Sequence, residues 1–177
     1  MSTHGTRESL KALHERLTTR VESVQISGSE ANWLAVDLCG RRMLLPLVQS
    51  GEIFSVSSIR RVPRTQPWFL GVAVLRGGLM GVVDLGVLLK LRAPFVGSGD
   101  TEAKLVALNP ALGVNVALWV DRLLGLRGVA SFNAVERPAP NGPPAMGQVL
   151  IDADGQRWQE ISLQDMAEWP EFLSVAT

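Results

Sequence analysis

The chain has 177 residues, a length that suits one domain of one or two closely packed halves. Hydrophobic residues make up 46% of it, enough to build a core, which argues against global disorder. Lysine plus arginine equals aspartate plus glutamate at 17 each, so there is no net positive charge to attract nucleic acid. Cys39 is the single cysteine, which excludes a disulfide framework within the chain.

Residues 68–89 are almost unbroken apolar sequence, interrupted by Arg76 and Asp84. In a membrane-spanning helix a central arginine or aspartate costs roughly 2.5–3.5 kcal/mol, so this stretch is not predicted to cross a bilayer. Residues 1–8 lack the apolar run of a signal peptide. We therefore expect a cytoplasmic protein that does not insert into a membrane.

An apolar stripe runs through residues 6–24 at steps of three and four, with charged residues between. This spacing predicts an amphipathic helix. Two roles are open for it, packing on its own domain and binding a partner, and the first is favoured. Residues 26–30 are predicted to form a linker, so residues 1–30 precede a domain that spans residues 31–177.

Short apolar runs separated by glycine and proline fill the first part of that domain. Residues 33–38 and 43–45 are predicted to form a β-hairpin, and residues 53–56 a further strand. Pro63 and Pro67 then interrupt regular structure.

A second hairpin is predicted within the apolar stretch. Residues 71–75 and 79–83 are short runs joined by glycines, a pattern that favours strands over a helix. Gly77 or Gly78 can supply the positive φ of a tight turn. Arg76 would then lie at the tip of the hairpin, where its guanidinium can reach solvent.

Asp84 stands where the N-cap of a short helix over residues 85–89 belongs. The order strand, turn, strand, Val-Asp and leucines then recurs, with residues 104–108 and 114–120 leading into Asp121. This weak repeat suggests two related β subdomains of the small-barrel kind, with Asp121 capping in the same way as Asp84.

The C-terminal part predicts one more hairpin and a helix. Residues 149–151 and 157–161 flank residues 152–155, Asp-Ala-Asp-Gly, which suit a hairpin turn. Ser162 begins a helix with a start that resembles a capping box, and this helix is expected to stop by Pro170.

Candidate ligands for metals and catalysis are few and scattered. His4 and His14 lack the company of further ligands that a zinc site needs. Cys39 is expected to be a buried structural thiol. Asp152 and Asp154 lack the spacing of a calcium loop, and the turn explains them. No catalytic, metal or cofactor site is therefore predicted.

A cluster of arginines near an aromatic residue has two interpretations. Arg60, Arg61, Arg64 and Trp68 could imitate a nucleic-acid patch, but the neutral chain and the lack of interleaved aromatics favour a solvated loop. The residues as a whole favour a binding module over an enzyme. Two alternatives stay open: an enzyme or ligand-binding barrel whose site forms only in the fold, and a nucleic-acid-binding small barrel.

Two motifs of the second hairpin carry a family resemblance. Residues 71–77 read Gly-Val-Ala-Val-Leu-Arg-Gly, and residues 82–85 read Val-Val-Asp-Leu. They resemble the signature of the CheW family of chemotaxis scaffold proteins, in which Gly-Val, Asn-Leu-Arg-Gly and Val-Asp-Leu occur at this spacing on adjacent strands. Residues 114–120 with Asp121 and Gly125 resemble a later strand of that family.

The resemblance spans residues 32–165, with three departures from the family pattern. Val74 replaces the usual asparagine, Gly81 stands where many members have proline, and Ser50 stands where valine is common. These changes affect the details of partner contact and leave the expected fold unchanged.

The resemblance implies a mainly β fold of two packed five-stranded SH3-like barrels with N- and C-terminal helices. It implies an adaptor with no catalysis and no cofactor. The adaptor would bridge the regulatory domain of a CheA-like histidine kinase and the cytoplasmic tip of a methyl-accepting chemoreceptor at membrane-bound receptor arrays.

Five residues match family positions that contact those partners. Arg76 and Gly71, with the neighbouring Gly77, match positions tied to receptor and kinase coupling. Glu52 and Ile53 match a surface tied to the kinase.

Within the family, the chain looks most similar to the PilI-like adaptors of twitching motility driven by type IV pili. The pointers are residues 67–73, the N-terminal helix, Trp158 and residues 172–176. Flagellar chemotaxis is the alternative pathway.

Overall fold

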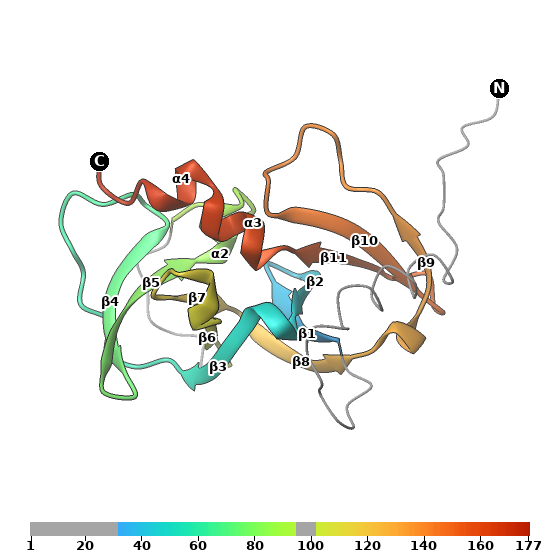
Figure 1. Ribbon diagram of the computed structural model, residues 1–177, viewed down its shortest axis with the longest axis horizontal. Helices are drawn as coiled ribbons and strands as arrows, with labels where there is room; N and C mark the ends of the chain where they lie inside the picture. Colours follow the sequence, from blue (N-terminus) through green and yellow to red (C-terminus); the bar gives the residue numbers. More distant parts are fainter. Residues whose placement is uncertain (1–31, 95–101) are drawn as a thin grey trace.

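The computed structural model describes residues 32–94 and 102–177, and these fold into two β-sheets that lie side by side (Figure 1). The predicted N-terminal helix and linker lie outside the described residues. The first sheet has six strands in the order β8-β1-β2-β11-β10-β9. Its strands are β1 (Trp33–Leu38), β2 (Arg41–Pro46), β8 (Arg122–Arg127), β9 (Phe132–Glu136), β10 (Met146–Asp152) and β11 (Arg157–Ile161).

The second sheet has five strands in the order β3-β6-β7-β5-β4. Its strands are β3 (Ser50–Ser55), β4 (Phe69–Leu75), β5 (Gly78–Asp84), β6 (Lys104–Leu108) and β7 (Val116–Val120). Short helices connect and cover the strands: η1 (Leu47–Gln49), α2 (Leu85–Leu88), η2 (Pro110–Leu112), η3 (Val129–Ser131), α3 (Leu163–Glu168) and α4 (Pro170–Leu173). No helix among the described residues is long and apolar enough to cross a membrane.

The predicted mainly β architecture and the predicted hairpins are confirmed, with two corrections. One sheet has six strands rather than five, because β8 pairs with β1. Both copies of the predicted repeat also lie in the same five-stranded sheet, so the repeat does not mark two subdomains. The chain instead divides so that the N-terminal hairpin β1–β2 and the C-terminal strands β8–β11 share the six-stranded sheet.

The core explains why the strands are so apolar. Along β1, Leu34, Val36 and Leu38 join a cluster shared by both sheets, whereas Trp33 and Ala35 join a cluster within the six-stranded sheet. β7 alternates in the same way between the shared cluster and a third cluster in the five-stranded sheet. Strands covered on both faces need apolar side chains at successive positions, which explains the apolar runs of β1 and β7.

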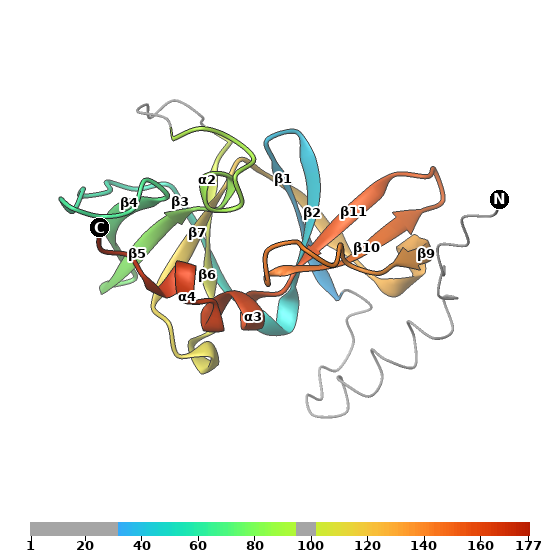
Figure 2. The ribbon, with the colours of Figure 1, turned by 90° about the horizontal axis from the view of Figure 1, so that it is seen from above.

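Helix α3 lies over the junction of the two sheets, and α4 continues from it along the five-stranded sheet (Figure 2). The predicted cap is confirmed, since the backbone N–H of Asp165 donates to the hydroxyl of Ser162 (3.2 Å). Gln49 ties the helix start to η1, because its Oε1 accepts from the backbone N–H of Leu163 (2.8 Å). The Phe172 ring of α4 stacks on Trp68 with centroids 6.1 Å apart.

Candidate functional site

The β4–β5 hairpin projects Arg76 from the end of the five-stranded sheet. Arg76 and Gly77 occupy the turn with φ values of 51° and 76°, the positive signs of the two central residues of a type I′ turn. A positive φ was expected only at a glycine, and a non-glycine residue rarely adopts it. The Arg76 side chain is 76% exposed, so the turn presents it to solvent as predicted.

Two apolar side chains accompany Arg76 on the hairpin. Val74 and Leu79 are directly opposed across β4 and β5, and they are 66% and 59% exposed. Opposed side chains on one face of a hairpin are in contact distance, so these two form one exposed apolar spot. Val74 is the position where the resembling family usually has asparagine, which makes this spot more apolar than the family pattern.

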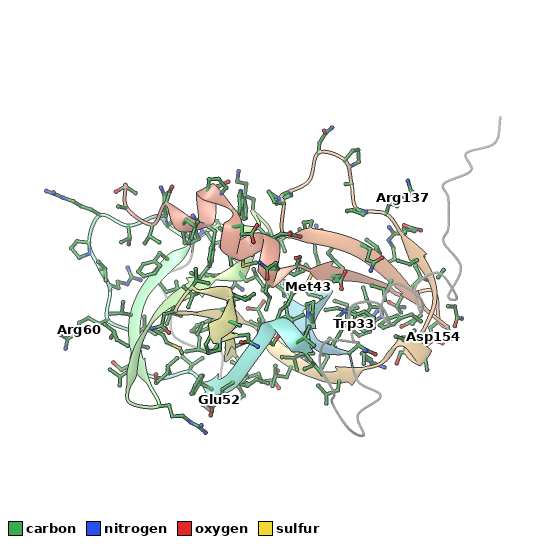
Figure 3. All side chains as sticks on the ribbon, in the orientation of Figure 1. Trp33, Met43, Glu52, Arg60, Arg137 and Asp154 are labelled. Atoms are coloured by element: carbon green, nitrogen blue, oxygen red, sulfur yellow. The ribbon has the colours of Figure 1, made fainter. Side chains whose placement is uncertain are left out.

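An ion pair joins the hairpin to the opposite edge of the same sheet. Arg76 Nη2 lies 2.7 Å from Glu52 Oε1 on β3, and Figure 3 shows Glu52 near the hairpin tip. β3 and β4 are the two edges of the sheet, so the sheet curls until its edges approach. Sequence reasoning missed this local partner of Arg76, because a cross-sheet contact leaves no pattern in the chain.

Four of the five predicted contact residues therefore lie at one end of the five-stranded sheet. Ile53 follows Glu52 on β3 and is 40% exposed. We define the hairpin surface by its residues Glu52, Ile53, Val74, Arg76, Gly77 and Leu79. It combines a charge pair of at most about 1 kcal/mol, because both members are solvated, with an exposed apolar spot of the kind that marks contact sites.

Gly71, the fifth predicted residue, is buried and lies away from the hairpin surface. Its φ is 135°, and a Cβ at this position would lie 2.2 Å from the carbonyl oxygen of Arg60. Only glycine permits this close backbone approach. The glycine lets Arg60 and Val72 exchange two backbone hydrogen bonds of 2.8 and 2.9 Å, so it fixes the loop that precedes β4.

Asp84, the second charge of the apolar stretch, has a structural role. Its side chain is fully buried, and its Oδ1 accepts from the backbone N–H of Val87 at 3.1 Å. The predicted N-cap is confirmed. The carboxylate also receives two hydrogen bonds from Arg92 Nη2, at 2.8 and 2.9 Å, which sequence reasoning missed.

The predicted helix cap at Asp121 is wrong, because the residues that follow it form strand β8. Asp121 instead accepts from the backbone N–H of Cys39 (2.7 Å) and from Arg92 Nη1 (2.6 Å). Strands β5 and β7 are parallel neighbours. Asp84 and Asp121 each follow the last valine of one of these strands, so they lie at the same end of the sheet. Arg92 bridges the two carboxylates, and Cys39 ties them to the six-stranded sheet.

Asp84, Arg92, Asp121 and Cys39 form one polar cluster. Its electrostatics keep Arg92 charged and paired with the two aspartates. Desolvation by itself would lower the pKa of the Arg92 guanidinium, but the hydrogen bonds and charges of Asp121 and Asp84 outweigh it and raise that pKa. Burial raises the pKa of the Cys39 thiol against the opposing charge of Arg92. A thiol with a raised pKa is a poor nucleophile at neutral pH, so the cluster is suited to holding the two sheets together.

The described residues contain no group of three or more His, Cys, Asp or Glu side chains placed to hold a metal ion. His4 and His14 lie outside the described residues. Trp68, the aromatic residue of the nucleic-acid alternative, is buried against Phe172 and does not face solvent where a base could stack on it. The turn at Asp152 is confirmed, since its Oδ1 accepts from the backbone N–H of Asp154 (3.0 Å).

Comparison with known protein families matches residues 32–171 to the CheW-like domain. Among solved structures, the chain resembles the scaffolding protein TtCheW from Thermoanaerobacter tengcongensis, with a TM-score of 0.61 and 19% sequence identity. The alignment covers 74% of this chain and 88% of that protein, and it shows a shared fold. A comparison with curated proteins gave no match.

The family match agrees with the resemblance that residues 71–77 and 82–85 predict, and it covers most of the chain. CheW-like scaffolding proteins are adaptors without enzymatic activity. The two-sheet architecture agrees with the same assignment. This chain belongs to the CheW-like domain family.

Proposed function

We propose that this protein couples methyl-accepting chemoreceptors to a CheA-like histidine kinase, as an adaptor in the twitching motility of type IV pili. The observation that carries the proposal is the hairpin surface, where Arg76, Glu52 and two exposed apolar side chains lie at one end of the five-stranded sheet. Family membership supports the adaptor role, and the motifs of residues 67–73 and 172–176 favour the pilus pathway over flagellar chemotaxis.

The hairpin surface suits exchange of one charge partner for another. The Arg76–Glu52 pair is exposed, so opening it costs little. A carboxylate on the receptor or kinase can then form an ion pair with Arg76, while Val74 and Leu79 become buried against an apolar residue of the partner. Gly77 permits the turn, and Ile53 adds apolar area on the kinase side. In this proposal Gly71 acts indirectly, through the fold of β4.

Purified receptor tips and the kinase regulatory domain test the proposal in a pull-down. Arg76→Glu places two acidic side chains together and is expected to weaken binding of at least one partner about tenfold or more, because like charges replace a complementary pair. The matched control is Arg157→Glu, which breaks another exposed ion pair, that of Arg157 Nη2 with Glu136 Oε2 (2.6 Å), on the other sheet.

The control is expected to bind as the unaltered protein does. Equal binding of both partners by Arg76→Glu, with an unchanged unfolding midpoint, would contradict the assignment of the hairpin surface. A twitching assay of a deletion strain addresses the pathway: restored twitching by the intact gene supports it, and a defect only in swimming assigns the protein to flagellar chemotaxis instead.

A further inference from the structure

A cleft of about 280 Å³ lies beside the loop that precedes β4, away from the hairpin surface. Its lining combines two arginines with polar and apolar side chains: Arg61, Arg64, Thr65, Gln66, Phe69 and Leu70. The cleft lies at the start of β4 and Arg76 follows its end, a separation of about 20 Å along the strand. The two surfaces can therefore be tested separately.

The chain segment around this cleft carries positive side chains and no negative ones. Residues 53–83 contain four arginines (Arg60, Arg61, Arg64 and Arg76) and no lysine, aspartate or glutamate, although the whole chain is neutral. Within the described residues, Arg76 is paired with Glu52, whereas Arg60, Arg61 and Arg64 form no salt bridge with a carboxylate. Among residues 32–94 and 102–177, no acidic side chain lines the cleft.

Backbone contacts hold both ends of the arginine-bearing loop. At one end, Arg60 and Val72 exchange two hydrogen bonds over Gly71. At the other, the backbone N–H of Gln66 donates to the carbonyl of Val175 (2.8 Å), and that of Thr177 donates to the carbonyl of Arg64 (3.1 Å). Figure 3 shows Arg60 at the outer edge of the five-stranded sheet, and Figure 1 shows the C-terminus near the same loop.

Arg64 itself has a φ of 58°. A non-glycine residue in this region is strained, and such strain persists only where the surroundings enforce it. Here the pairing of residues 64–66 with residues 175–177 supplies that constraint. The cleft is therefore preformed, which lowers the entropy lost when a ligand binds.

The geometry points to a binding site for a short acidic peptide segment that carries a large apolar side chain between its carboxylates. Guanidinium groups bind carboxylates through strong charge-assisted hydrogen bonds, which Arg61 and Arg64 can supply. Phe69 and Leu70 are half-buried and offer apolar contact to the intervening side chain. The volume is at the small end for a ligand site, so the segment is short.

A fluorescein-labelled hexapeptide of alternating glutamate and leucine tests this site by fluorescence anisotropy, with a glutamine–leucine peptide as the neutral control. The double variant Arg61→Gln, Arg64→Gln is expected to bind the acidic peptide about five- to tenfold more weakly, because two charged contacts are lost. Added salt is expected to weaken binding to the unaltered protein. The matched control is Arg41→Gln, which alters an exposed arginine on β2 outside the cleft.

The control variant is expected to bind within about twofold of the unaltered protein, because exposed charges away from a site contribute little. No binding of the acidic peptide, equal binding of the glutamine peptide, or equal losses in the control and double variants would each overturn the inference. Tighter capture of single-stranded DNA than of the peptide, lost in the double variant, would assign the cleft to nucleic acid instead. Arg76→Glu is expected to leave peptide binding unchanged, so failure here and failure of the proposed adaptor function are separate results.

Discussion

Arg92 is predicted to be one of the most important polar residues for the stability of the fold. Its guanidinium is 22% exposed and bridges Asp84, which is fully buried, and Asp121, which is 19% exposed. Replacing it by methionine keeps much of the side-chain volume and removes the charge. The substitution leaves a buried carboxylate with no cation beside it.

The expected loss follows from that uncompensated charge. Removing one member of a buried ion pair costs about 3–5 kcal/mol, well above the value of about 1 kcal/mol or less for an exposed pair. We expect Arg92→Met to lower the free energy of unfolding by about 3 kcal/mol or more. For a domain of this size each kcal/mol moves the unfolding midpoint by about 2–4 °C, so the midpoint should fall by about 6 °C at least.

Chemical denaturation of four proteins measures this: the unaltered chain, Arg92→Met, Asp84→Asn and the double variant. Asp84→Asn removes the charge that Arg92→Met leaves unpaired. The double variant is therefore expected to be more stable than Arg92→Met alone, and this non-additivity identifies the charge as the cause. A loss below about 1 kcal/mol in Arg92→Met, comparable to an exposed pair, would refute the reasoning.

Two further predictions concern other residues with strong local constraints. Gly71→Ala is expected to destabilise the fold by about 2 kcal/mol or more. The new Cβ would meet the carbonyl oxygen of Arg60 at 2.2 Å, and the φ of 135° is unfavourable for alanine. Hydrogen exchange at the Val72 amide should therefore accelerate, and unchanged protection would count against the prediction. Cys39 is expected to react slowly with iodoacetamide at pH 8, since a raised pKa leaves less thiolate at a given pH. Reaction of the folded protein as fast as that of the denatured chain would disprove this.

Local features of the fold could be read from the sequence because turn and cap chemistry is local. Gly77 at the β4–β5 turn, the Ser162 cap and the Asp84 cap each depend on residues within four positions. The pairing of distant strands could not be read in this way. β2 lies parallel to β11, with Met43 opposite Gln159. The sequence of neither strand indicates that it pairs with the other.

The same distinction explains the candidate site. The exposed position of Arg76 followed from the hairpin, but its partner Glu52 lies on a strand whose place in the sheet the hairpin does not determine. The cap at Asp121 was mispredicted because Val-Asp before leucines suits both a helix start and a strand. Its true partners, Arg92 and the backbone of Cys39, come from two separate loops.

The motif of residues 71–77 spans one strand whose two ends reach the two proposed surfaces. At its end, Arg76 and Gly77 present a charge to solvent, and at its start Gly71 admits the backbone of Arg60. A substitution at Gly71 that displaces the loop would change the cleft beside Arg61 and Arg64 while leaving Arg76 in its turn. An effect of Gly71 on partner binding is therefore evidence about the arginine-bearing loop as well as about the hairpin surface, and only variants at Arg76 and at Arg61 with Arg64 separate the two.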